Sequence, residues 1–387
     1  MRILHIDTER GWRGGERQVL WLATELARRG HASFVAARAG EPLAERAGRI
    51  GLPVVPCAPA FEADPRVVLR LRAFVKRERI DVIHAHTAHA VSLGALATLS
   101  MDVPLVVARR VDFHLRRNPA SRWKYRRAAA VIAVSSAVAE ILAIDGVDQG
   151  RIAIVPDGTD IHREIRPAAP ETLIALGVPR GAPLVVQVAQ LVGHKDPVNF
   201  VRAIAVANDR APGLHALLVG EGPLRPAVES AIRELRLGDR LHLAGYRTDA
   251  DALLAAAHVV VLSSREEGMG SVLLDALLIG RPIAATRAGG IPDIVEHGVS
   301  GLLAPVGDSA ALGAHIATLL RDRPLADRLA SAARERVADF SVERMADRTL
   351  GVYERVLARR APDARDPTPR RTDSPTRARS PSSTRAP

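Results

Sequence analysis

The chain has 387 residues, of which 47% are hydrophobic, so it is long enough for two domains of about 100–200 residues each. Aromatic residues make up only 3% of the chain, which disfavours a protein that stacks nucleic-acid bases on exposed rings. The net charge of +11 is uneven, because residues 1–165 carry 25 basic and 18 acidic residues, whereas residues 166–360 carry 23 and 22. A basic first half can attract a phosphorylated substrate, an anionic membrane surface or nucleic acid.

Cysteine content and the N-terminal residues indicate the cellular compartment. The single cysteine, Cys57, excludes an internal disulfide and a multi-cysteine metal centre, and it is typical of a reducing compartment. The first residues lack the layout of a secretory signal, and no run of 18 apolar residues is present. We therefore predict a cytoplasmic protein, with peripheral contact to the inner face of the cytoplasmic membrane left open.

The first half alternates strand and helix patterns. Short apolar bursts predict strands at Met1–Asp7, His31–Ala36, Asp81–His86, Pro104–Ala108, Ala130–Val134 and Arg151–Val155. Helical periodicity predicts helices at Gln18–Arg29, Val67–Arg77 and Ala88–Leu99. A glycine-bearing loop with Gly11, Gly14 and Gly15 separates the first strand from the first helix. Such alternation predicts a parallel sheet that is covered on both faces.

A second alternating series follows an aperiodic linker that ends near Pro170. Its predicted strands are Leu184–Ala189, Ala216–Gly220, Arg240–Ala244, Val259–Ser263, Pro282–Ala285 and Gly301–Ala304. Its predicted helices are Val198–Asn208, Leu224–Leu235, Asp249–Ala257, Ser271–Ile279, Ala310–Arg321, Leu325–Ala338 and Val342–Arg360. Residues 361–387 contain no apolar residue larger than Ala or Pro, which predicts a disordered tail. The fold class is α/β, with domains at 1–165 and 166–341 whose strand ends face a shared cleft.

The most informative motif runs from residue 264 to 301 and begins after a predicted strand. Gly268 and Gly270 allow close backbone approach to a ligand. The backbone N–H groups of Met269, Gly270 and Ser271 lie at a predicted helix start, which favours an anion. Glu267 and Asp275 flank this start, and carboxylates in such a place are suited to sugar or ribose hydroxyls.

This acid-glycine pattern resembles the paired-acid motif of the retaining family 4 glycosyltransferases, which have the two-Rossmann GT-B fold. The resemblance implies that Glu267 holds the donor sugar and that Asp275 holds the nucleotide ribose. It departs from the commonest pattern, because the second acid is Asp and not Glu. The resemblance extends over nearly the whole ordered chain, and it implies that the helix at 342–360 crosses back to the first domain.

Further donor-side residues follow from the same resemblance. The GGER segment with Gly14 and Gly15 resembles the loop that closes over the donor phosphates, and Gly289 and Gly290 match the glycine-rich loop under the donor. Tyr246 matches the residue that borders the nucleobase.

Lys195 is the donor-phosphate candidate in the segment VAQLVGHKDP. The family often has Arg where this chain has Gln190, so one positive charge is missing. Lys195 and the helix-start N–H groups would stabilise a diphosphate leaving group without a metal.

The acceptor side is less well marked. His84 and His86 share one side of a strand, and His86 lies where relatives place acceptor-side residues. Where several relatives have a histidine that contacts the donor sugar, this chain has Arg110, with His114 further on, and we favour Arg110.

The stretch 114–127 holds six Lys and Arg residues together with Trp123 and Tyr125. It fits a phosphorylated or lipid-linked acceptor, an anionic membrane surface or a plain solvated helix face.

Two motifs are set aside. The Asp249–Asp251 pair matches the metal-binding D-x-D pattern, but helix capping explains it better. The pair Gly220 and Gly222 lacks the third glycine of a dinucleotide fingerprint.

The sequence therefore predicts a retaining hexosyltransferase that needs neither metal nor cofactor. It would use a UDP-, GDP- or ADP-linked sugar as co-substrate and a glycan, glycolipid or small-molecule acceptor, and cell-envelope polysaccharide or lipopolysaccharide synthesis would be a typical setting. No nucleic-acid partner is expected. Two alternatives stay open: a nucleotide-sugar 2-epimerase of the same fold, and a non-catalytic protein that binds sugar nucleotides or an anionic surface.

Overall fold

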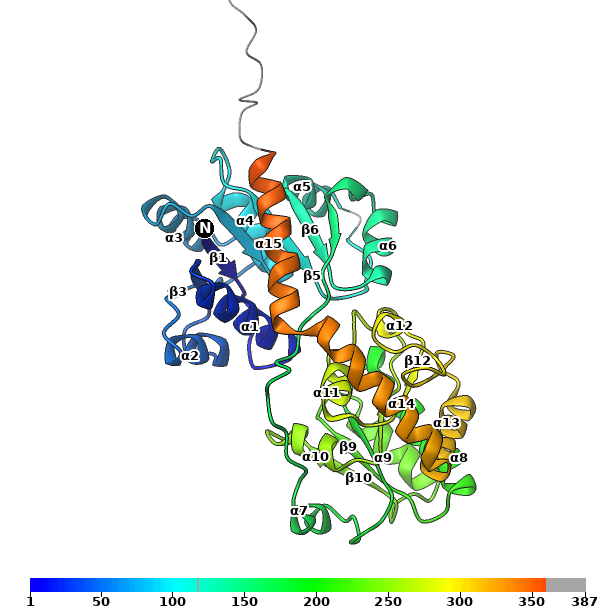
Figure 1. Cartoon of the computed structure of the whole chain (residues 1–387). Coiled ribbons are helices and arrows are strands. Elements are labelled where there is room, and N and C mark those ends of the chain that lie inside the picture. The colour runs from blue at the N-terminus through cyan, green and yellow to red at the C-terminus, as the bar shows by residue number, and fades with distance from the viewer. Residues whose placement is uncertain (117, 360–387) are drawn as a thin grey trace, which may run out of the picture.

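The computed structural model describes residues 1–116 and 118–359 and shows two parallel sheets, each with helices around it (Figure 1). Arg117, the last residue of the helix predicted at 342–360 and the tail predicted at 361–387 lie outside the described residues. The predicted α/β class with two doubly wound sheets is confirmed. The predicted domain boundaries themselves stay predictions.

The first sheet has the strand order β3-β2-β1-β4-β5-β6-β7. Its strands are β1 (Arg2–Ile6), β2 (Ala32–Ala37), β3 (Val54–Pro56), β4 (Val82–Ala85), β5 (Leu105–Arg109), β6 (Ala130–Ala133) and β7 (Ile152–Ile154). Its helices are α1 (Gly14–Arg28), α2 (Pro42–Arg49), α3 (Pro65–Arg77), α4 (Ala88–Ala97), α5 (Pro119–Arg127) and α6 (Ser136–Ile144), with a 3₁₀ turn at Gln149–Arg151.

The second sheet has the order β10-β9-β8-β11-β12-β13. Its strands are β8 (Leu184–Val188), β9 (His215–Val219), β10 (Leu241–Gly245), β11 (Val259–Leu262), β12 (Ile283–Thr286) and β13 (Leu302–Ala304). Its helices are α7 (Pro170–Ala175), α8 (Pro197–Arg210), α9 (Arg225–Glu234), α10 (Ala250–Ala256), α11 (Val272–Ile279), α12 (Ile291–Ile294), α13 (Ser309–Arg321) and α14 (Arg323–Arg336), with 3₁₀ turns at Gly193–Lys195 and Val337–Phe340.

Alternate residues of the first sheet face two different helix layers, as the strand period of two requires. Ile3 packs in a core with Leu22 of α1 and Tyr353 of the last helix, α15 (Val342–Ala358). Leu4 points the other way, into a core with Leu71 of α3. Because both faces are covered, the strands are apolar almost throughout.

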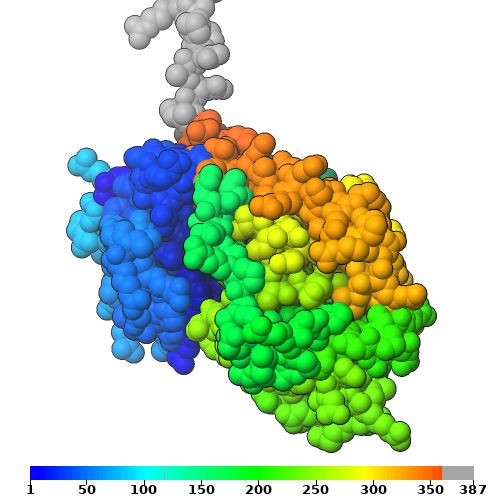
Figure 2. Space-filling model, turned by 60° about the horizontal axis from the view of Figure 1, so that its bottom comes forward, coloured from blue at the N-terminus to red at the C-terminus, as the bar shows by residue number. Residues whose placement is uncertain are grey.

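Two chain segments join the halves. The stretch from β7 to α7, which is fully described, forms no helix or sheet strand, and its Thr159 makes a parallel bridge with Ser341 of the returning chain. Beyond Ser341, α15 lies across the N-terminal half beside α1 (Figure 1). In Figure 2 the green chain that leaves β7 lies between the blue first half and the yellow and orange parts of the molecule.

Some predicted elements need correction. The first helix starts at Gly14 and not at Gln18, so Gly14 and Gly15 form its first turn instead of a loop. The Glu16 carboxylate accepts the Arg13 N–H at 2.7 Å, and this capping contact lets the helix start four residues earlier than the apolar pattern indicates. The sequence analysis also missed the short strand β3 and five helices of fewer than ten residues each, which are α2, α5, α6, α7 and α12.

No helix within the described residues has the length and apolar character that a bilayer crossing demands.

Candidate active site

The predicted site residues follow strands of both sheets at their carboxyl ends, where open α/β folds bind ligands. Asp7 follows β1, His86 follows β4 and Arg110 follows β5 in the first half. Lys195 lies after β8, and Glu267 lies between β11 and α11 in the second half. The two strand-end sets face each other, because the Gly268 loop packs against the backbone of Arg110.

The predicted donor residues Lys195 and Glu267 form an ion pair through Lys195 Nζ and Glu267 Oε2. Ser264 Oγ donates a second hydrogen bond to the same carboxylate oxygen at 3.1 Å. Glu267 is only 8% exposed, so its charge is held in place by these two partners. The structure therefore places the candidate sugar ligand and the candidate phosphate ligand side by side.

The predicted anion-binding helix start is also present. α11 begins at Val272, one residue later than predicted, and Ser271 occupies the N-cap without a side-chain cap bond. Among the described residues, the N–H groups of Met269, Gly270 and Ser271 have no hydrogen-bond acceptor. Three free donors at a helix N-terminus, near a lysine, can bind a diphosphate.

Asp275, the predicted ribose ligand, is bound by two arginines. Its oxygens accept hydrogen bonds from Arg17 Nη2 at 3.0 Å and from Arg163 Nη2 at 2.7 Å. Burial raises the pKa of Asp275, and the two guanidinium groups oppose this shift by stabilising the ionised form. A carboxylate has about four acceptor positions, so these bonds leave acceptor positions unused, but Asp275 is buried and its predicted ribose contact stays a prediction. Neither arginine was identified from the sequence; Arg163 lies in the segment taken as linker.

The glycines of the motif let backbone pack on backbone. A Cβ on Gly268 would lie 2.0 Å from the carbonyl oxygen of Arg110, so only glycine allows the halves to meet there. Gly289 has φ +46°, and a Cβ there would lie 1.9 Å from the Glu267 carbonyl oxygen. Gly290 N donates to the same carbonyl at 2.9 Å. In this structure Gly289 and Gly290 thus support the Glu267 loop, and their predicted donor contact stays a prediction.

Gly14 lies at the contact between the halves, since its Cβ would be 2.9 Å from Ser271 Oγ, whereas Gly15 faces open space. Gly270 packs near Leu262. Met269 is buried, and its sulfur accepts a hydrogen bond from Asp157 N at 3.1 Å.

His86 and Arg110 belong to a buried hydrogen-bonded chain. Arg110 binds Asp157 Oδ1 at 2.9 Å and His86 Nδ1 at 3.1 Å. Because the guanidinium can only donate, His86 Nε2 carries the proton and donates it to His5 Nδ1 at 3.1 Å. Burial lowers the pKa of His86 well below its ordinary value and that of His5 to about 3, so both rings are neutral at pH 7.

His84 lies next to this chain, with its ring centroid 4.0 Å from that of His86, and its Nδ1 is 2.7 Å from the Tyr353 hydroxyl. His5, His84 and His86 are the one group among the described residues whose ligand atoms are near enough to share a metal ion. Arg110 is in direct contact with the group, and its fixed positive charge opposes a cation there. We therefore interpret the three histidines as a hydrogen-bonded network.

Asp7 is a candidate functional residue that the sequence analysis missed. It is 2% exposed, accepts the Glu9 N–H at 2.9 Å and lies near Glu16 and Arg110. Burial raises the pKa of Asp7 to about 7, so it exchanges a proton near neutral pH. Its position directly after β1, at the carboxyl end of a parallel strand, was the sequence signal that could have identified it.

Other predicted residues lie apart from this centre. Tyr246 follows β10 and is 66% exposed, so its ring is free to meet a base. His114 is bound to Asp145 at 2.8 Å, and it therefore does not replace Arg110.

The capping explanation for the Asp249–Asp251 pair is wrong. Asp249 stands at the N-cap of α10, but its carboxylate accepts two bonds from Arg247, at 2.7 and 2.6 Å, and none from the helix. Asp251 accepts a bond from Arg163 at 2.6 Å. Each of the two carboxylates is thus paired with a guanidinium group.

Comparison with known proteins identifies the family. The model for "Glycosyltransferase Family 4" matches residues 12–163, and the model for "Glycosyl transferases group 1" matches residues 170–336. The chain is a family 4 glycosyltransferase. The 2-deoxystreptamine glucosyltransferase of Streptomyces kanamyceticus is 33% identical to this glycosyltransferase over 269 residues, 67% of this chain and 69% of the relative.

Two other relatives cover more of the glycosyltransferase. The D-inositol 3-phosphate glycosyltransferase of Nocardiopsis dassonvillei is 27% identical over 89% of this chain and 90% of its own length. Anabaena HepE, crystallised with UDP-glucose, is 25% identical over 92% of this chain and 100% of its own, with a TM-score of 0.79. The predicted GT-B fold and the prediction of a transferase that uses a nucleotide-sugar donor are confirmed.

Proposed function

We propose that this glycosyltransferase moves a hexose from a UDP-linked donor to an acceptor hydroxyl with retention of configuration and without a metal ion. The Lys195–Glu267 pair beside three free N–H groups is the observation that carries the proposal. The UDP-glucose complex of HepE supports UDP among the three nucleotides that the sequence left open.

Donor binding follows from this geometry. The diphosphate lies on the N–H groups of Met269, Gly270 and Ser271, and the Lys195 ammonium neutralises it. Glu267 accepts hydrogen bonds from the sugar hydroxyls, and Asp275 accepts one from the ribose. Tyr246 covers the base. Developing negative charge on the leaving diphosphate is stabilised by groups that are already in position, which is the efficient form of electrostatic catalysis.

The transfer step needs no protein nucleophile. The acceptor oxygen attacks the anomeric carbon on the face from which the diphosphate leaves. The bond between that carbon and the phosphate oxygen breaks, and its electron pair stays on the diphosphate. A phosphate oxygen then takes the proton of the acceptor hydroxyl. We assign Glu267 to sugar binding and not to nucleophilic attack: its Oε2 accepts hydrogen bonds from Lys195 and Ser264, and its Oε1 is left for sugar hydroxyls. Arg110 and the neutral His86 lie on the first-half side of the cleft, where the acceptor approaches.

The experiment measures UDP-glucose binding by thermal shift and its slow hydrolysis by UDP release, with GDP- and ADP-glucose as comparisons. Lys195→Ala is expected to lower UDP release about 100-fold, and Glu267→Gln by a similar factor, with melting temperatures near the wild type. Lys76→Ala, at an exposed site in α3, is the matched control and is expected to behave as wild type.

Three results would contradict the proposal. They are unchanged UDP release by both site variants, loss of activity with EDTA that Mn²⁺ restores, and conversion of the donor sugar to its 2-epimer without added acceptor. The last result would establish the epimerase alternative.

A further inference from the structure

A cavity of about 520 Å³ lies in the first half between α4, α5 and the loop that follows β5. Phe113, which lines it, packs edge-on against His194 of the second half, with ring centroids 5.8 Å apart. His194 directly precedes Lys195, the proposed diphosphate ligand. This cavity, the α4–α5 cavity, therefore reaches the boundary between the halves beside the loop that carries Lys195.

The described wall of the α4–α5 cavity is positively charged. It includes Arg109, Arg116 and Lys124 but a single carboxylate, Glu62. That carboxylate is already bound by Lys124 Nζ at 2.6 Å and by Ser92 Oγ at 2.7 Å. Two guanidinium charges are thus left without a carboxylate partner among the described residues.

Those two guanidinium groups differ in what they contact. Arg109 donates to the Phe113 carbonyl oxygen, which holds it in the cavity wall. Arg116 is exposed and has no hydrogen-bond acceptor within the part of the chain that the structure describes. Guanidinium groups form two-point hydrogen bonds with phosphate and carboxylate, so these are anion-binding groups.

Aromatic surface completes the wall. Trp123 is 39% exposed and Phe113 is 44% exposed, and both line the cavity, so their rings are accessible to a molecule in it. Pockets of this kind combine apolar rings, which hold the body of a ligand, with a few charged groups, which fix its orientation.

We propose that the acceptor is a hydroxyl-bearing molecule that carries a phosphate or carboxylate and binds in the α4–α5 cavity. Its anionic group lies on Arg109 and Arg116, its ring face packs on Trp123, and its reactive hydroxyl points toward the Phe113–His194 contact. This inference rests on the proposed function and adds the charge class of the acceptor. Neutral and amine-bearing acceptors lack the group that pairs with the two guanidinium charges.

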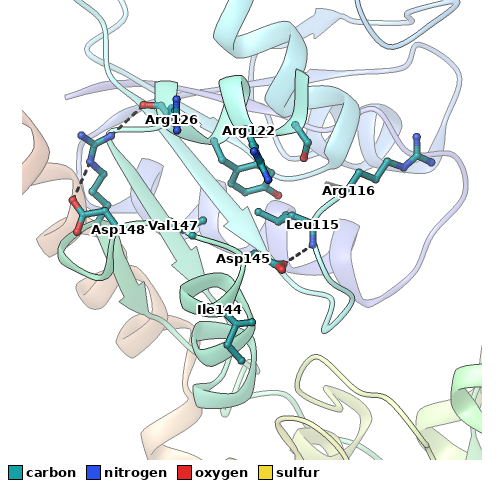
Figure 3. Close-up of a pocket in the computed structure, with 12 residues that line it drawn as sticks. Leu115, Arg116, Arg122, Arg126, Ile144, Asp145, Val147 and Asp148 are labelled. Carbon is teal, nitrogen blue, oxygen red and sulfur yellow. Dashed lines mark hydrogen bonds and ion pairs between the residues drawn. The ribbon is translucent and has the colours of Figure 1, made fainter. Parts of the chain in front are cut away.

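A second cavity, of about 430 Å³, lies on the other side of α5 and supplies a control (Figure 3). Arg122 and Arg126 of α5 line it, together with Ile144 and Asp145 at the end of α6. Arg116 lines both cavities, whereas Arg122 lines only this one. Arg122 is exposed and precedes Trp123 on the same helix, so its removal tests for a general effect of lost positive charge.

The experiment supplies UDP-glucose together with acceptor pools matched in size. The phosphate pool contains glucose 6-phosphate and myo-inositol 1-phosphate, and the carboxylate pool contains glucuronate. The neutral pool contains glucose and myo-inositol, and the cationic pool contains glucosamine. Mass spectrometry detects products, and quenching of Trp123 fluorescence measures binding without donor, with Trp123→Phe to assign the signal. We expect an anionic pool to react at least tenfold faster than the others. Comparing the phosphate and carboxylate pools identifies the anion.

The preference is the ratio of the rate with an anionic pool to the rate with the neutral pool. Arg116→Ala is expected to lower this ratio at least tenfold, and Arg116→Lys is expected to restore part of it. Arg122→Ala is expected to leave the ratio unchanged. Equal or faster reaction of the neutral or cationic pool would overturn the proposal. So would the absence of product and of quenching with both anionic pools while UDP-glucose is bound and hydrolysed. Failure to bind or hydrolyse UDP-glucose, with quenching by the anions intact, would contradict the proposed function and leave the anion site standing.

Discussion

Asp7 shows how burial of one residue couples stability to pH. Burial raises the pKa of Asp7 from 3.8 to about 7, so between these values the folded protein keeps a proton that the unfolded chain has lost. The free energy of unfolding therefore falls as pH rises from about 4 to 7, by up to about 4 kcal/mol, and stays low above pH 7. His5 has its effect at acidic pH. Because its pKa is lowered in the folded protein, the free energy of unfolding falls as pH falls below about 6.5.

Asp7→Asn isolates the first effect. The amide oxygen can still accept the Glu9 N–H, but the group no longer ionises. Urea unfolding measures the free energy of unfolding of both proteins at pH 5 and at pH 8. The difference, variant minus wild type, is expected to be about 3 kcal/mol larger at pH 8 than at pH 5. The contribution of His5 cancels in this comparison. A difference between the two proteins that does not change with pH would contradict the assignment.

At the scale of elements, α15 is joined to the sheet beneath it by one buried polar contact. Tyr353 is fully buried, and its hydroxyl lies 2.7 Å from His84 Nδ1 on β4. Tyr353→Phe removes the hydroxyl and leaves the imidazole nitrogen without a partner, which is expected to cost about 1–3 kcal/mol of unfolding free energy. Urea denaturation measures this loss, and Tyr353→Leu, which also leaves a cavity, is expected to cost more. Equal stability of Tyr353→Phe and wild type would show that the hydrogen bond contributes nothing.

At the scale of the whole molecule, the two halves meet through a few close contacts. Ser135 Oγ donates to the Gly268 carbonyl at 2.6 Å, and Ser136 N and Oγ both donate to Asp293, at 2.7 and 2.6 Å. On the other side of Gly268 lies the Arg110 carbonyl, with no room for a Cβ. Closure of the halves excludes water from the cleft, which favours transfer over hydrolysis.

Gly268→Ala is therefore expected to hold the halves apart. Small-angle X-ray scattering with UDP should show a larger radius of gyration than for the wild type, and transfer should fall at least tenfold while the melting temperature stays close to wild type. Gly48→Ala, in the last turn of α2 with open space around it, is the matched control. An unchanged radius together with unchanged transfer would mean that this contact is not needed for closure.

The order of strands and helices was predictable because each element carries its own signal. Apolar bursts marked all of the strands except β3, where Pro53 and Pro56 flank two valines and interrupt the apolar run. Capping decided the starts of helices: Glu16 sets the start of α1, and the apolar residues alone put it four residues too late. The helices α5 and α6 were missed although the shorter α10 and α11 were predicted, because α5 is mostly polar and basic and α6 is apolar on nearly all sides, so neither shows an apolar stripe.

The sequence by itself determined the α/β class and the two-sheet layout, because these depend on local spacing and residue chemistry. Its resemblance to family 4 also indicated Lys195, Glu267 and Asp275 as candidate donor ligands. Only the tertiary structure decided that Lys195 binds Glu267, that Arg17 and Arg163 bind Asp275, and that Phe113 meets His194 beside a basic cavity. These partners are separated by many residues in the chain, and the distance between them depends on how the two sheets pack, which no local pattern encodes.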